Sequence, residues 1–97
     1  MSGRLESLTP FERELLAVLP TEPIGLSLAK LAGGLLDNTG PQACGQVKAG
    51  LVAVARLLGG LYVSRGDDDL GQADVELYGV RRAARLHVQA FLWKRRV

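Results

Sequence analysis

The spacing of the apolar residues changes at Gly59 and Gly60. Upstream of these glycines, apolar residues recur every three or four positions, which is the spacing of one face of an α-helix. The positions are Val47, Leu51, Val54 and Leu58. Downstream, residues 61–65 and 73–78 alternate with a period of two around the glycine-flanked segment 66–72. The pattern therefore predicts a helix followed by a β-hairpin. The shared face of its two strands is expected to carry Leu61, Val63, Val75 and Leu77.

Two further helices are predicted before this one. Thr9, Pro10 and Glu12 form a capping-box sequence with proline at the first helical position, so a helix is expected over residues 10–19. Ser27 can cap a second helix, and a turn at residues 37–40 separates it from the third. The apolar stripe of the second helix is expected to comprise Leu28, Leu31, Ala32 and Leu35.

The third helix is expected to begin at Pro41, and a last helix is expected over residues 81–96, which contain no glycine or proline. With 97 residues, of which 47% are hydrophobic and 23% charged, the chain is expected to fold as one small domain. The predicted class is mainly α with a small β-hairpin, an α+β fold.

Catalysis is not expected from the residue types present. A single cysteine, Cys44, and a single histidine, His87, offer neither a disulfide nor a zinc cluster. The acidic run 67–69 lacks the ligand spacing of a calcium loop, and the glycine pairs end helices instead of opening them around a phosphate. We therefore expect a protein that is not an enzyme and that needs no metal or cofactor.

The first residues lack the apolar stretch of a signal peptide, and no apolar run is long enough to span a membrane. The sequence thus predicts a cytoplasmic protein with no membrane contact. Residues 1–8 are expected to form a flexible N-terminus.

The order of helix, extended segment, helix, turn, helix and hairpin resembles the winged helix-turn-helix family of DNA-binding domains. Residues 27–32 and 47–66 carry the resemblance most clearly. Residues 27–32 are similar to the helix that precedes the recognition helix in this family. Residues 47–66 are similar to a recognition helix that ends in glycine and is followed by a strand leading to the wing. The resemblance covers residues 9–80. It implies a three-helix core with a two-stranded wing, to which residues 81–97 add a C-terminal helix.

The resemblance also implies that the third helix enters the major groove of double-stranded DNA. Gln42 and Gln46 are candidates for contacts to adenine, and Lys48 and Arg56 for contacts to guanine or phosphate. Other hydroxyl and basic side chains are expected to contact phosphates. They are Ser27, Lys30, Thr39, Arg65, Arg81, Arg82 and Arg85. The implied function is a sequence-specific regulator of transcription or of a replicon, associated with the nucleoid.

Two features depart from this pattern. The run of Asp67, Asp68 and Asp69 at the wing tip is expected to be solvated and would be repelled by phosphate. The face of the third helix that would read DNA carries small residues, namely Gly45, Ala49 and Ala53, which also suit packing against a protein. The alternative is therefore a winged-helix interaction module or complex subunit, binding a protein through this small-residue face or the acidic wing.

The last helix has apolar residues on two sides. Ala83, Leu86, Ala90 and Trp93 form one stripe, expected to face the domain, whereas Val88 and Leu92 fall on the other side. Since a small domain cannot cover both sides, the second neighbour is expected to be the same helix of another copy. The sequence therefore predicts a two-fold homodimer, matching a palindromic DNA site. Its interface residues are expected to be Leu86, Val88, Phe91, Leu92 and Trp93.

The charge is divided along the chain. The net charge is only +2, but residues 1–76 hold six basic and ten acidic side chains, and residues 77–97 hold six basic and no acidic ones. Any DNA-binding surface is therefore expected to occupy only part of the molecule.

Overall fold

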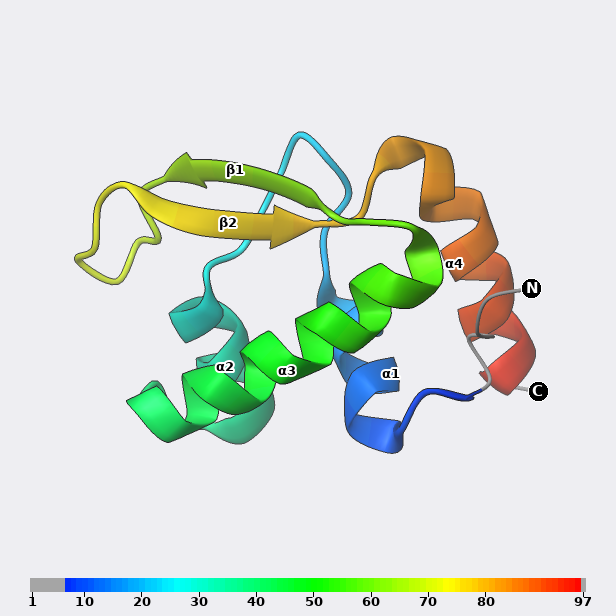
Figure 1. Ribbon diagram of the computed structural model, residues 1–97, viewed down its shortest axis with the longest axis horizontal. Coiled ribbons are helices and arrows are strands. Elements are labelled where there is room, and N and C mark those ends of the chain that lie inside the picture. Colours follow the sequence, from blue (N-terminus) through cyan, green and yellow to red (C-terminus); the bar gives the residue numbers. More distant parts are fainter. Residues whose placement is uncertain (1–6, 97) are drawn as a thin grey trace.

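The structure is a computed structural model that describes residues 7–96, with side chains through residue 93 (Figure 1). Within those residues it contains four helices and one two-stranded antiparallel sheet. In chain order the elements are α1 (Pro10–Val18), α2 (Leu28–Leu36), α3 (Pro41–Leu58), β1 (Tyr62–Gly66), β2 (Val75–Gly79) and α4 (Arg82–Arg96). The predicted α+β class is confirmed, together with the predicted order of elements.

The helix ends follow from local sequence. At the start of α1 the Thr9 hydroxyl accepts a hydrogen bond from the Glu12 amide at 3.2 Å, and the Glu12 carboxylate accepts one from the Thr9 amide at 3.0 Å. Ser27 caps α2 by accepting from the Lys30 amide at 3.1 Å. At the end of α3, Gly59 has φ of 76°, a left-handed conformation that glycine adopts without steric cost.

The core lies where α1 and α2 pack against α3. Val47 and Val54 of α3 are fully buried and Leu51 nearly so, which confirms the predicted inner face of this helix, and Leu58 packs at its edge. Leu15 and Leu31 fill the space from α1 and α2. The helices are thus held by one apolar cluster, which leaves the opposite side of α3 to solvent.

The strands pair in a register that corrects the predicted hairpin face. Val63 lies opposite Tyr78, and Ser64 lies opposite Leu77, so each cross-strand pair joins an odd-numbered residue with an even-numbered one. Cross-strand partners share a face of the sheet, and consequently Val63 lies on the other face from Leu77. The prediction that Leu61, Val63, Val75 and Leu77 share one side was wrong, because it aligned the two strands out of register by one residue.

Residues 20–26 run along the free edge of β2. The amide and carbonyl of Leu26 pair with those of Tyr78 at 2.9 and 2.8 Å, and the Val80 amide donates to the Pro20 carbonyl at 2.7 Å. A Cβ atom on Gly79 would lie only 2.5 Å from the Ile24 carbonyl oxygen. Glycine at this position therefore permits the close approach that joins α1 and α2 to the sheet.

Helix α4 packs against the domain with the face opposite to the one predicted. Val88 is fully buried and Phe91 is 6% exposed, whereas Leu86 is 80% exposed and Trp93 is 70% exposed. Ala84 and Leu92 pack at the margin of the core. The predicted inner stripe is thus the outer one, and Val88 and Phe91 are removed from the predicted dimer interface because their own core covers them.

The predicted flexible N-terminus falls mostly outside the described residues, which begin at residue 7. Leu8, the last residue of that predicted segment, is 4% exposed and belongs to the core cluster. The Arg13 side chain donates a hydrogen bond to the Leu8 carbonyl at 2.8 Å. Leu8 is therefore part of the folded domain.

Candidate nucleic-acid interface

The solvent side of α3 carries four polar side chains proposed from the sequence. Gln42, Gln46, Lys48 and Arg56 are all exposed, and none of these side chains makes a hydrogen bond or ion pair with the described part of the chain. No acidic residue occurs in the whole segment 38–66 that contains them. The structure thus leaves these four side chains unpaired, with Gln42 and Arg56 on the solvent face of α3 and Gln46 and Lys48 on its two opposite flanks.

Small residues separate the polar ones on this side of α3. Gly45 and Ala49 are exposed, Ala53 is half-buried, and a Cβ atom on Gly45 would meet no atom within 4 Å. Val52 adds an apolar side chain that is 47% exposed. The exposed side of α3 is therefore smooth enough for close approach by a groove wall or by another helix.

The two hydroxyl candidates differ in availability. Ser27 is 2% exposed, and its side chain is already engaged as the cap of α2, so its predicted role in binding phosphate is wrong. Thr39 is exposed in the turn before α3, and its carbonyl accepts a contact from the Cys44 thiol at 3.6 Å. Gly40, at the N-cap of α3, provides no side-chain cap for the first amides of the helix.

The wing pairs two of the predicted phosphate-binding cations with its own carboxylates. The Lys30 ammonium lies 3.8 Å from the Asp69 carboxylate. The Arg65 guanidinium donates to the Asp74 carboxylate at 3.0 Å and to the Asp74 carbonyl at 2.6 Å. This hydrogen bond, together with the nearby negative charge, raises the pKa of Arg65 above its ordinary value. Lys30 and Arg65 are therefore partly neutralised within the chain.

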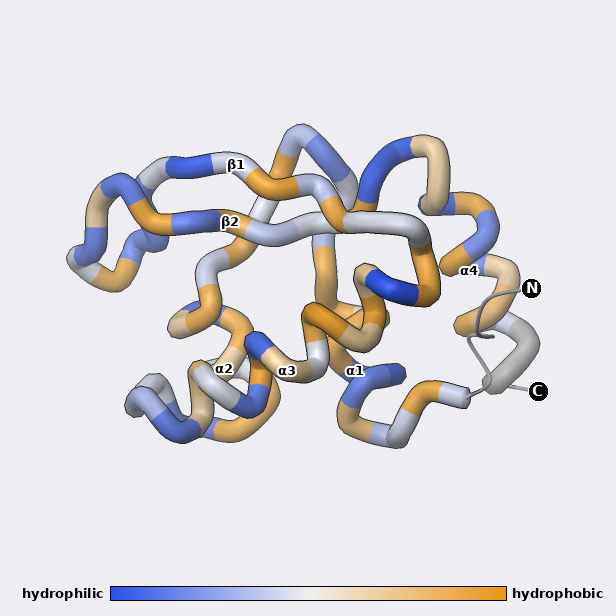
Figure 2. The backbone as a smooth tube through the Cα atoms, in the orientation of Figure 1, coloured by the Kyte–Doolittle hydropathy of each residue, from blue (hydrophilic) through white to orange (hydrophobic). Residues whose placement is uncertain are grey.

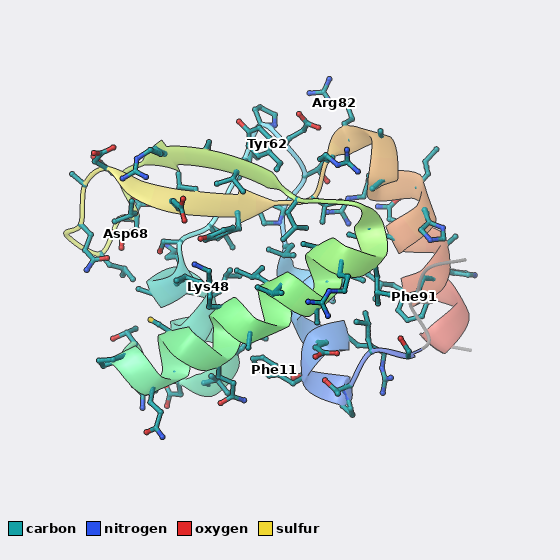
Figure 3. The ribbon with its side chains drawn as sticks, viewed as in Figure 1. Phe11, Lys48, Tyr62, Asp68, Arg82 and Phe91 are labelled. Carbon is teal, nitrogen blue, oxygen red and sulfur yellow. The ribbon has the colours of Figure 1, made fainter. Side chains whose placement is uncertain are left out.

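Asp68 is a buried part of the wing turn, which corrects the prediction that the whole acidic run is solvated. It is 3% exposed, and its Oδ1 accepts from the Leu70 amide at 2.8 Å and from the Gln72 amide at 3.0 Å. Its Oδ2 has no hydrogen-bond partner in the described structure. Asp68 therefore shapes the wing turn (Figure 3), and the same turn brings Asp69 to Lys30 of α2.

A cleft of about 360 Å³ lies between the hairpin and the starts of α2 and α3. Lys48 lines it from α3, opposite Glu76 and Tyr78 of β2. The Tyr78 hydroxyl donates to the Glu76 carboxylate at 2.6 Å. Burial raises the pKa of Tyr78 to about 12, and the hydrogen bond to Glu76 adds to the rise. The sequence reasoning missed Glu76 and Tyr78, because their place in the cleft depends on the strand register.

The basic residues at the start of α4 hold the fold together more than they form a free surface. Arg81 donates to the Leu58 carbonyl at the end of α3, at 3.0 Å. Arg85 donates to the Thr21 hydroxyl at 2.5 Å and to the Leu19 carbonyl at 2.9 Å. The structure thus gives Arg81 and Arg85 positioning contacts that the sequence did not predict.

Arg82 is the exception among these three arginines. Its side chain is exposed and makes no hydrogen bond or ion pair within the described residues, although its amide donates to the Glu22 carboxylate at 2.6 Å. Figure 2 shows hydrophilic stretches at both the wing tip and the start of α4. The wing contributes mostly acidic residues and the start of α4 contributes basic ones, so the two ends of the sheet differ in charge.

No protein-family model, curated protein or solved structure matches the chain. Among residues 7–96, no three histidine, cysteine, aspartate or glutamate side chains come together as a group that could hold a metal ion. Over the same span, no helix has the length and apolar character needed to cross a membrane.

Proposed function

We propose that the chain is a winged-helix domain that binds double-stranded DNA through the exposed side of α3 and regulates transcription or a replicon. The element order supports the winged-helix assignment, as does the Leu26 segment, which pairs with β2 as a third, minimal strand. The observation that carries the DNA proposal is that Gln42 and Arg56 on the solvent face of α3, and Gln46 and Lys48 on its flanks, are exposed and unpaired within the described residues.

The dimensions of α3 suit this role. An α-helix with its side chains is about 10–12 Å wide, and the major groove of B-DNA is about 12 Å wide. Glutamine can form paired hydrogen bonds with an adenine edge, and lysine or arginine with guanine. The gap left by Gly45 and Ala49 would let the helix backbone come close to the bases.

The wing has a different role in this proposal. Asp67 and Asp69 are exposed carboxylates at its tip, and phosphate oxygens repel such groups. DNA would therefore contact α3 and the turn containing Thr39, with Arg82 as an additional phosphate contact. The wing tip would point away from the duplex.

A salt titration tests the proposal. Binding to a labelled duplex of mixed sequence is measured by fluorescence anisotropy between about 50 and 200 mM salt. If Lys48, Arg56 and Arg82 each neutralise one phosphate, the slope of log K against log salt should be about −2.7. No binding, or binding without salt dependence, would contradict the proposal.

Variants locate the surface. Lys48→Ala combined with Arg56→Ala should weaken binding and make the salt slope shallower by about two. Lys30→Ala is the matched control, because it also removes a positive charge, but one that Asp69 already pairs. The single variant Lys48→Ala is compared with this control. Equal losses of duplex affinity in Lys30→Ala and Lys48→Ala would show that α3 is not the binding element.

The alternative function, a protein-interaction module, is favoured by the smooth face around Gly45, Ala49 and the 47% exposed Val52. Such a module would bind no duplex in the same titration. The homodimer stays a prediction from the sequence. Of the five residues predicted for its interface, Leu86 and Trp93 are the ones that are largely exposed.

A further inference from the structure

The outer face of α4 is an unpartnered apolar surface. Ala83, Leu86, Ala90 and Trp93 are all exposed and follow one another every three or four residues, so they form one stripe along the helix, called here the outer stripe. Leu86 is 80% exposed and Trp93 is 70% exposed. Figure 1 shows α4 at one end of the molecule, with the rest of the fold on one side only.

The surroundings of the outer stripe are positively charged. Arg82 is exposed next to its first residue and has no side-chain partner in the described structure. By sequence, residues 77–97 contain six basic residues and no acidic one. Arg81 and Arg85 keep their charge although backbone carbonyls and Thr21 occupy some of their donors. By sequence α4 contains no acidic residue, and the Glu22 carboxylate meets the start of the helix at the Arg82 amide.

We propose that the outer stripe binds an acidic amphipathic helix of a partner protein. Apolar residues spaced by three and four positions on one helix match the same spacing on another, which is how helix pairs bury such stripes. Glutamates or aspartates flanking the partner's apolar face would complement exposed Arg82 and the basic sequence of residues 77–97. Tryptophan is enriched among the residues that dominate binding energy, which gives Trp93 the place of an anchor.

Charge argues against a second copy of this chain as the occupant. A second copy would bring the same charges to the outer stripe, because residues 77–97 contain six basic residues and no acidic one by sequence. Pairing two α4 helices would therefore bring like charges together. An acidic partner gains attraction from the same residues. This inference does not depend on whether the chain binds DNA.

Trp93 provides the measurement, because it is the only tryptophan in the chain. The probe is a 15-residue peptide, the length of α4, with leucines at helical spacing and glutamates on both flanks. Binding should shift the emission of Trp93 to the blue, and added salt should weaken it. A second peptide with glutamine at every glutamate position should bind at least about tenfold more weakly.

Two variants assign the site. Leu86→Ser should weaken binding of the acidic peptide at least about tenfold, without loss of fold because the side chain is already exposed. Val63→Ser is the matched control, because Val63 is an apolar residue of β1 that is 49% exposed and lies outside α4, so its replacement should leave the affinity unchanged.

Four results would overturn the proposal. The first is no binding of the acidic peptide, and the second is equal affinity for the glutamine peptide. The third is a blue shift in the absence of peptide that grows with protein concentration and is accompanied by a doubled mass. The fourth is a blue shift that needs vesicles of equal parts phosphatidylcholine and phosphatidylserine. The third result would assign the outer stripe to a second copy, and the fourth to an anionic membrane surface.

Discussion

Substitution at two positions of α4 tests which of its faces packs on the domain. Val88 is fully buried and Leu86 is 80% exposed, although both are apolar and only two residues apart. Val88→Ala removes two methyl groups from the core, at about 0.8 kcal/mol each, and leaves part of the space empty. Alanine favours a helix over valine by about 0.5 kcal/mol, which offsets some of the loss. The expected net destabilisation is about 1.5 kcal/mol.

Leu86→Ala removes more atoms but should cost less. Most of the Leu86 side chain is in solvent, so the change in unfolding free energy should stay within about 0.5 kcal/mol. If instead Leu86 faced the core, as the sequence predicted, its replacement by alanine would cost about 2–5 kcal/mol. The two orientations of α4 thus predict opposite rankings of the variants.

Urea denaturation followed by circular dichroism distinguishes them. With a slope of about 1–1.5 kcal/mol per molar urea, Val88→Ala should lower the midpoint by about 1 M. In thermal unfolding the same change should lower Tm by about 6–12 °C. The curves are repeated at two protein concentrations so that any contribution from self-association is separated. A loss for Leu86→Ala equal to or larger than that for Val88→Ala would refute the orientation described here.

Three further outcomes are expected. Gly79→Ala should destabilise the domain by about 1–3 kcal/mol in urea, because its Cβ would meet the Ile24 carbonyl at 2.5 Å. Tyr78 has its pKa raised from about 10 to about 12, so the stability from its neutral form is complete below pH 10 and is lost between pH 10 and 12; in a Tyr62→Phe background, which leaves Tyr78 as the one tyrosine of the sequence, a tyrosinate absorbance midpoint near 10 would contradict this. Asp69→Asn should tighten duplex binding by up to about fivefold by releasing its lysine. Asp67→Asn removes the same charge from an unpaired carboxylate, so it should tighten duplex binding less in the same anisotropy assay. Equal effects of the two variants would show that the ion pair between Lys30 and Asp69 does not cause the change.

Local sequence determines much of this fold. Thr9 with Glu12, and Ser27, begin helices through hydrogen bonds that span three residues, and Gly59 ends one by its own conformational freedom. The inner face of α3 was predictable because the spacing of its apolar residues is consistent with one buried face only. These features depend on neighbours within a few positions, so a sequence pattern is sufficient to find them.

The faces of α4 and of the hairpin required tertiary structure. Helix α4 has two apolar stripes, and spacing alone does not choose between them. Its rotation is fixed by Arg85, which reaches Leu19 and Thr21, and by Arg81, which reaches Leu58. In the hairpin, the turn 67–74 sets the register, and a shift of one residue moves every side chain to the other face.

The candidate interface divides in the same way. Exposed residues of α3 could be predicted once its inner face was known. The pairing of Lys30 with Asp69 and of Arg65 with Asp74 could not, since the wing turn carries the aspartates to their partners. Asp68 differs from its two neighbours, because its carboxylate accepts hydrogen bonds from two amides of the turn instead of facing solvent.

The attachment of α4 to the first loop has a consequence for synthesis of the chain on the ribosome. Arg85 contacts Leu19 and Thr21 across 66 and 64 residues of sequence, and Val88 and Phe91 belong to the same buried cluster as Leu15 and Leu16 of α1. A nascent chain lacking these residues would expose the apolar side of its N-terminal helices. Since the closing contacts come from α4, we expect the domain to reach its native state only after residues 82–93 have left the ribosome. Until then, the N-terminal helices would depend on chaperones for protection from aggregation.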